Sequence, residues 1–145
     1  MKQKNIVTLF FISISAFLLQ SCSNGEKPEN VATDFLDAYL STDYAKAAEF
    51  CTPELGKDLS EAVRELESLA PEVKELMKRH TSNYTPQITA VEEPKGRDTV
   101  IVSYSIINRP KKDSISVGGD VIIEKQLSLV KIEDNWRVAA LNNNK

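Results

Sequence analysis

Histidine, cysteine and aromatic residues are scarce in this chain. Its 145 residues include one histidine, His80, and two cysteines, Cys22 and Cys51, and only 7% of the residues are aromatic. A single histidine excludes a metal site built from two histidines, and it leaves a Ser-His-Asp arrangement only one possible base. The sequence also has no Gly-rich phosphate loop, no CxxC pair and no HExxH motif. These common enzyme patterns are therefore missing, and we expect no metal or organic cofactor.

Positive charge is also in short supply. The formal net charge is −3 at pH 7, and basic residues cluster only as the pairs Lys78-Arg79 and Lys111-Lys112. Proteins that bind nucleic acid normally present a basic stripe or patch to the phosphate backbone. The sequence therefore excludes nucleic acid as a partner.

The amino terminus has the layout of an export signal. Lys2 and Lys4 precede a mostly apolar block from Ile6 to Leu19. A helix that spans a bilayer needs about 20 predominantly apolar residues, and this block is shorter. A basic start followed by a short apolar block favours a cleaved signal peptide over an uncleaved anchor. We assign the signal peptide to residues 1–21.

The end of this segment resembles the lipobox of bacterial lipoproteins. Leu19-Gln20-Ser21-Cys22 places an aliphatic residue three positions before a cysteine and a small residue directly before it. The resemblance implies that Cys22 is diacylglycerol-modified, becomes the first residue of the mature chain and is then N-acylated. Each buried methylene contributes about 0.8 kcal/mol, so several acyl chains hold a small domain firmly on a membrane. The alternative is a plain signal peptide followed by an incidental cysteine.

Lipidation would place the protein in the cell envelope. Ser23 follows the cysteine, whereas an aspartate there signals retention in the inner membrane in the best-known lipoprotein system. We therefore expect an outer-membrane location.

The mature chain has the size of one domain. Removing residues 1–21 leaves 124 of the 145 residues, and the loss of Lys2 and Lys4 changes the formal charge from −3 to −5. This length suits a single domain with its own core. Residues 22–29 have turn and charge composition and predict a flexible tether, so residues 30–145 form the domain. Cys51 is then a lone thiol, for which a small apolar core position is favoured over a reactive or metal-binding role.

The first half of the domain is helical in pattern. Apolar residues recur at helical spacing from Val31 to Tyr39, and Ser41-Thr42-Asp43 ends this helix and starts a second, short one. Thr52 and Pro53 are typical of the start of a third helix. These signals predict three helices before residue 82.

The third helix carries a long apolar series at spacings of three and four residues, which we call the apolar seam: Leu55, Leu59, Ala62, Leu66, Leu69, Val73, Leu76 and His80. Pro71 should kink or split the helix. We expect the seam to pack in the core. Its alternative role is a coiled-coil surface for a partner, which Pro71 and the shortness of the seam weaken.

The second half changes to a period of two. Strands are predicted at Ile88–Val91, Thr99–Ile107, Val121–Ile132 and Trp136–Leu141, with turn residues between them. Helices followed by antiparallel strands predict an α+β domain, in which the sheet buries one face on the helices. We expect five residues to be largely buried: Phe35, Leu59, Leu66, Tyr104 and Trp136.

Two segments carry a resemblance to a known family. Phe35–Glu54 contains F-x-x-A-Y and D-Y-x-K-A, and Glu133–Val138 contains W-x-V. They resemble small lipoprotein domains of unknown function in the nuclear-transport-factor-2-like, or cystatin-like, superfamily. The resemblance covers roughly residues 30–141 and implies helices packed in a curved four-stranded antiparallel sheet, shaped as a cone. Some members are isomerases or dehydratases that use Asp, His or Tyr in the cone, whereas many have a pocket and no known chemistry.

Five side chains are candidates for the lining of a pocket in such a cone: Tyr39, His80, Tyr104, Lys125 and Trp136. His80 ends the apolar seam, so a partly buried residue at a helix end is favoured over an acid–base pair with Tyr84 or Asp58. Lys125 alternates with apolar residues, which favours a lysine that protects an edge strand over one that points into a pocket. Large aromatic residues at such positions are usually core residues.

The sequence therefore favours a lipid-anchored, non-catalytic binding or interaction module of the cell envelope. Its partner would be the membrane through Cys22, together with a small molecule or an envelope protein. The alternative is a small-molecule lyase or isomerase that uses the cone pocket. An open cavity with converging polar groups would distinguish the enzyme from the interaction module.

Overall fold

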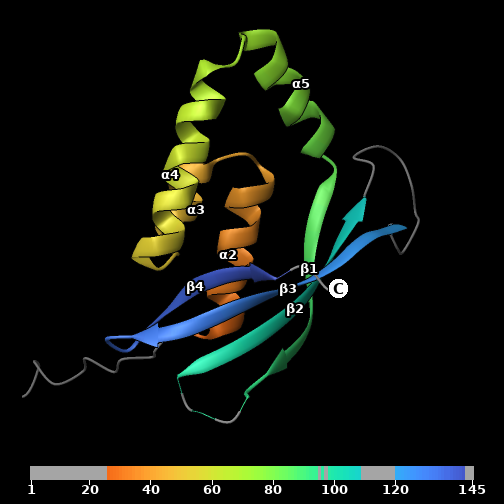
Figure 1. Cartoon of the computed structure of the whole chain (residues 1–145). Helices are drawn as coiled ribbons and strands as arrows, with labels where there is room; N and C mark the ends of the chain where they lie inside the picture. The colour runs from red at the N-terminus through yellow and green to blue at the C-terminus, as the bar shows by residue number, and fades with distance from the viewer. Residues whose placement is uncertain (1–25, 95, 97, 109–119, 143–145) are drawn as a thin grey trace, which may run out of the picture.

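The computed structural model describes residues 26–94, 96, 98–108 and 120–142. The predicted signal peptide, the lipobox and Cys22 lie outside the described residues, so lipidation stays a prediction. The described chain runs through four helices and then four strands, drawn in chain order from orange to blue in Figure 1.

Each of the four helices begins with a proline in its first turn or directly after a capping side chain. They are α2 (Pro28–Leu40), α3 (Tyr44–Ala48), α4 (Pro53–Ser68) and α5 (Pro71–Thr81). Proline occupies the first turn of α2, α4 and α5, where its missing N–H costs no hydrogen bond. The side chains of Asp43 and Thr52 cap α3 and α4 by accepting the backbone N–H groups of Lys46 and Leu55.

The predicted break at Pro71 is confirmed. The helix divides into α4, which ends at Ser68, and α5, which starts at Pro71. Ala70 has an extended conformation (φ −60°, ψ 146°). The ring of a proline disfavours the helical conformation of the residue before it, so the two helices change direction at this point.

The four strands form one antiparallel sheet in the order β1-β2-β3-β4. They are β1 (Tyr84–Glu92), β2 (Thr99–Asn108), β3 (Asp120–Ile132) and β4 (Asn135–Asn142). The α+β class is thus confirmed, and only β1 is much longer than expected. The register shifts once in each strand pair, and such irregularities bend and twist a sheet.

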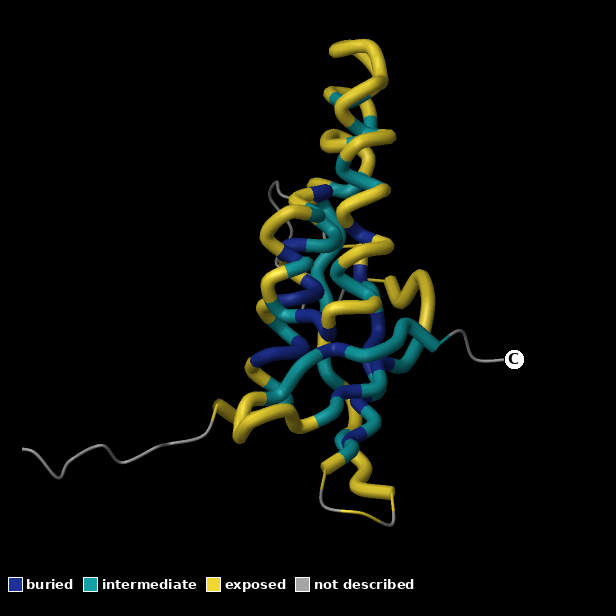
Figure 2. Tube along the Cα trace, turned by 60° about the vertical axis from the view of Figure 1, so that its left-hand side comes forward, coloured by how far each residue is buried: buried dark blue, intermediate teal, exposed yellow. Residues whose placement is uncertain are grey.

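The core lies between α2 and the sheet, because α2 contacts all four strands. Phe35 and Leu36 of α2 are completely or almost completely buried against the sheet. The strand residues that they join are Val100, Val102, Tyr104, Leu127, Leu129 and Val138. Figure 2 shows this buried layer in dark blue near the middle of the molecule.

A short segment between α3 and α4 lies beside β4. The backbone N–H of Val138 donates to the carbonyl of Phe50, and the N–H of Thr52 donates to the carbonyl of Val138, both at 2.9 Å. This pairing covers part of the outer edge of β4. It also buries Cys51, whose thiol donates to the carbonyl of Ala47 at 3.3 Å.

The expected core is only partly correct. Phe35, Leu59 and Tyr104 are 0, 5 and 3% exposed, whereas Leu66 and Trp136 are half-buried. Trp136 lies near the start of β4 and packs against the margin of the core. Leu66 lies in the last turn of α4.

The apolar seam does not pack in the core along its whole length. Leu69, Val73 and Leu76 are 37, 43 and 61% exposed, and α5 has no buried residue. The reason is geometric, because α4 and α5 form a hairpin that projects past the sheet (Figures 1 and 2). We call this element the α4–α5 hairpin.

Candidate functional site

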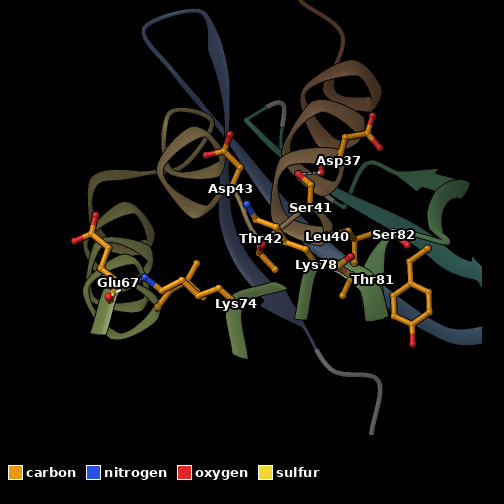
Figure 3. A pocket seen from close by; sticks show the side chains of 12 residues that line it. Asp37, Leu40, Ser41, Thr42, Asp43, Glu67, Lys74, Lys78, Thr81 and Ser82 are labelled. Atoms are coloured by element: carbon orange, nitrogen blue, oxygen red, sulfur yellow. Dashed lines mark hydrogen bonds between the residues drawn. The ribbon is translucent and has the colours of Figure 1, made fainter. Parts of the chain in front are cut away.

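A groove of about 720 Å³ lies between the carboxyl end of α2 and the α4–α5 hairpin. One wall is formed by the end of α2 and the turn that follows it, and the other walls come from α4, α5 and the start of β1 (Figure 3). Its lining residues are Asp37, Leu40, Ser41, Thr42, Asp43, Leu66, Glu67, Lys74, Lys78, Thr81, Ser82 and Tyr84. The groove is therefore outside the core between α2 and the sheet.

The turn between α2 and α3 is held by local hydrogen bonds. The hydroxyl of Ser41 donates to the carbonyls of Asp37 and Ala38, at 2.8 and 2.9 Å. Thr42 follows with a left-handed backbone conformation (φ 62°). For a β-branched residue this conformation is strained, and it persists only where the surroundings impose it.

Charges of both signs face the groove. Asp37, Asp43 and Glu67 carry carboxylates, and Lys74 and Lys78 carry ammonium groups. The ammonium of Lys74 donates to the backbone carbonyl of Glu67 at 2.9 Å, which links the two helices of the hairpin (Figure 3). Partial burial, and secondly the charge of Asp34, raise the pKa of Asp37, while Lys46 opposes this rise. The groove suits a polar ligand or a side chain of a partner protein.

His80 and Tyr84 are brought together beside the groove. The phenol oxygen of Tyr84 lies 3.3 Å from Nδ1 of His80, and the two rings meet edge to face with centroids 5.6 Å apart. Tyr84 lines the groove, whereas His80 is exposed at the end of α5 and not partly buried as expected. Within the described ranges, no hydrogen bond or ion pair joins Asp58 to this pair.

Tyr39 belongs to an aromatic cluster at the margin of the core, and Tyr104 lies in the core itself. The ring of Tyr39 stacks on Phe35 at 5.6 Å and meets Tyr44 at 5.4 Å. Burial, and secondly the nearby Tyr39, raise the pKa of Tyr104 to about 12. The same two causes raise the pKa of Tyr44. The phenols of Tyr104 and Tyr44 therefore stay neutral at physiological pH, and Tyr104 packs as a core side chain, whereas Tyr44 is partly buried against the core.

Lys125 and Trp136 lie on the sheet, at opposite ends of the paired region of β3 and β4. Lys125 of β3 is opposite Tyr104 of β2 and is half-buried. β3 pairs with β4 only from Gln126 onward. Among the described strands, the preceding part of β3, which includes Lys125, therefore has β2 as a neighbour on one side and no strand on the other. Trp136 is opposite Lys131 at the other end of the β3–β4 pair.

None of the five predicted pocket residues lines the groove, and the groove itself is not apparent in the sequence. Its lining comes from four elements between residues 37 and 84, and only the turn at Ser41-Thr42-Asp43 is marked by a local pattern. The tertiary structure joins Tyr39 with Tyr104 and His80 with Tyr84, but it does not join the two pairs into one site.

Two further structural findings concern metals and membranes. In the part of the chain that the structure describes, no three His, Cys, Asp or Glu side chains are grouped so as to bind a metal ion. Over the same residues, no helix has both the length and the apolar character needed to cross a membrane.

The fold and the groove define an α+β protein with helices on one face of an open four-stranded antiparallel sheet. No family model matches the sequence, and no curated protein matches it significantly.

Three solved structures are similar in fold at low sequence identity. A SEC-C-motif protein from Rhodopseudomonas palustris is 10% identical, with a TM-score of 0.49 over 83% of this chain and 81% of that chain. A protein of unknown function from Mycobacterium tuberculosis is 14% identical, with a TM-score of 0.40 over 97% and 76%. A candidate dehydratase of the NTF2-like family from Streptomyces avermitilis is 15% identical, with a TM-score of 0.37 over 77% and 88%.

Proposed function

We propose that this protein is a lipid-anchored lipoprotein of the outer membrane whose nuclear-transport-factor-2-like domain is a non-catalytic interaction module. The observation that carries the proposal is the α4–α5 hairpin, which exposes the apolar residues Leu69, Val73 and Leu76. Contiguous exposed apolar side chains are characteristic of surfaces that bind other proteins.

The interior of the sheet supports binding over catalysis. Enzymes of this superfamily work inside the cone, but α2 occupies the corresponding face of this sheet. Phe35, Tyr104 and Leu127 fill it and are at most 3% exposed. A reacting substrate needs space about 3 Å from an acid–base group, and the burial of these large side chains favours a packed layer over a substrate cavity.

The position of the tether also suits this function. α2 begins at Pro28 at the sheet end of the molecule, whereas the turn of the α4–α5 hairpin lies at the opposite end (Figure 1). Residues 22–27 can span at most about 20 Å. A lipid at Cys22 would thus attach the domain by its sheet end and leave the hairpin accessible.

Metabolic labelling of the full chain with a fatty acid tests the anchor. Cys22→Ser should abolish the label and leave the unprocessed precursor, because only this cysteine is preceded by a lipobox. Cys51→Ser is the matched control and should keep the label. Label that persists in Cys22→Ser would contradict the anchor.

A lyase or isomerase remains the second candidate function, and the His80–Tyr84 pair beside the groove is the observation in its favour. Native mass spectrometry of the full chain would reveal a retained small molecule. His80→Gln and Lys125→Met should then be compared for binding and turnover of that molecule. Loss of turnover with unchanged binding would establish catalysis, because such a group acts in the transition state.

A further inference from the structure

The helix α5 lacks the packing that normally stabilises a helix of its length. It has 11 residues, none of them buried, and its N-cap residue Ala70 makes no side-chain capping bond. Isolated helices shorter than about 12–15 residues are marginal in water, and most helices in proteins are stabilised by packing of an apolar side. An additional surface that covers α5 would supply this packing.

The apolar side of α5 does not face the groove. Successive residues are about 100° apart around a helix, so Val73, Leu76 and His80 lie within about 60° of one another. Lys74, Met77 and Thr81 are less exposed, and around the helix axis they lie about 100° from Val73, Leu76 and His80. Lys74 and Thr81 line the groove. We call the side of α5 that bears Val73 and Leu76 the outer stripe.

We propose that the outer stripe is covered by the same stripe of a second copy of this chain, with the two α5 helices antiparallel. In this arrangement Val73 packs on Leu76 of the partner subunit, and the contact repeats by twofold symmetry. Such an interface is closed, so it produces a dimer and no larger assembly.

Charge complementarity selects the antiparallel orientation. Glu72 and Arg79 both flank the outer stripe, next to Leu76, and lie near opposite ends of α5. Antiparallel pairing places Glu72 beside Arg79 of the partner subunit, and symmetry forms this ion pair twice. Parallel pairing would instead bring Glu72 toward the uncharged Met77 of the partner subunit.

Arg79 is available for this contact. Its Nε lies 3.9 Å from a carboxylate oxygen of Glu75, and both side chains are more than 60% exposed. An exposed pair at this distance contributes little to stability, so Arg79 retains donors for a partner.

A second copy of this chain is the partner of the proposed interaction module. This pairing rests on that proposed function but does not require lipidation, so either can fail without the other. If both copies are anchored in one leaflet, the twofold axis is normal to the membrane and α5 lies parallel to the membrane surface.

Co-isolation of two differently tagged full-length copies tests the pairing. Both copies are expressed in the native envelope, extracted in mild detergent and captured through one tag, and the second tag is measured. Wild-type copies should co-isolate. Leu76→Lys in both copies should lower the second tag about tenfold or more, because the interface loses an apolar anchor and gains two charges.

Charge reversal gives the sharper test. Glu72→Arg alone and Arg79→Glu alone should each reduce co-isolation, because like charges then meet twice. A mixture of a Glu72→Arg copy with an Arg79→Glu copy should restore it, since only the mixed pair has opposite charges at both contacts. Glu61→Arg is the matched control, because this exposed residue lies on the side of α4 opposite Leu59 and Leu66.

The thermal midpoint of each purified variant verifies that it folds; Leu76 is 61% exposed, so its substitution should not unfold the subunit. Failure of the mixed pair to recover, or co-isolation that is unchanged in Leu76→Lys, would overturn the proposal. Absence of wild-type co-isolation would also overturn it.

Discussion

Thr42 shows how a single residue can carry backbone strain at the edge of a candidate site. It has φ 62° in the turn between α2 and α3, is buried and lines the groove. The turn is fixed on both sides, because Ser41 bonds back to α2 and Asp43 caps α3. The strain at Thr42 is therefore imposed by the two helices that it connects.

Replacing Thr42 with glycine should reveal this strain. A left-handed conformation costs an L-residue about 1–2 kcal/mol, which roughly offsets or exceeds the entropic cost of glycine. Thr42→Gly should thus leave the free energy of unfolding unchanged or raise it by up to about 1 kcal/mol. Urea denaturation measures this change.

Thr33→Gly is the control, because Thr33 lies inside α2 with helical geometry. This variant should lose up to about 1 kcal/mol, because glycine is a poorer helix former than threonine and the hydrogen bond from the Thr33 hydroxyl to the carbonyl of Glu29 is lost. Equal destabilisation by Thr42→Gly and Thr33→Gly would show that the left-handed turn carries no strain.

At the scale of elements, α4 is divided into two environments. Its first half packs on α3 and β4, and Leu59 is 5% exposed there. Its second half extends past the sheet, where Leu66 is half-buried beside the groove. Both leucines belong to the same apolar seam, so the periodicity of the sequence does not distinguish them.

Truncating the two leucines should separate these environments. Leu59→Ala should cost about 2–5 kcal/mol, as expected for a leucine removed from a packed core. Leu66→Ala should cost clearly less, because water already reaches part of its side chain. Chemical denaturation of the two variants measures the difference, and equal costs would place the second half of α4 in the core.

At the scale of the whole molecule, a buried thiol and a buried phenol make the stability of the fold depend on pH. Burial raises the pKa of the Cys51 thiol to about 11, an effect that Arg137 partly opposes, and the pKa of Tyr104 is about 12. The ordinary values are 9.0 and 10.0. The folded state therefore holds both protons to higher pH than the unfolded chain does.

Stability should consequently fall at alkaline pH. The contribution of the two neutral groups is complete below pH 9 and is lost as the pH rises toward 11 to 12. Tyr104→Phe should lose less stability between pH 8 and pH 11 than the wild type, because phenylalanine cannot ionise. Urea unfolding followed by the fluorescence of the single tryptophan measures this difference.

Cys51→Ala provides an independent comparison, since it removes the second buried group. A Tyr104→Phe variant with the same pH dependence as the wild type would mean that this phenol is accessible to solvent in the folded state.

The elements and the fold class follow from the sequence, because helix starts, the break at Pro71 and strand alternation are local properties. Pro53 and Pro71 mark helix starts, and the period of two from Thr99 onward marks strands. The groove and the exposure of Leu76 are decided only by the tertiary structure. A periodic pattern identifies the apolar side of a helix but not what lies against it. That depends on the angle between α4 and α5 and on where the sheet ends, and these arise from packing between residues far apart in the chain.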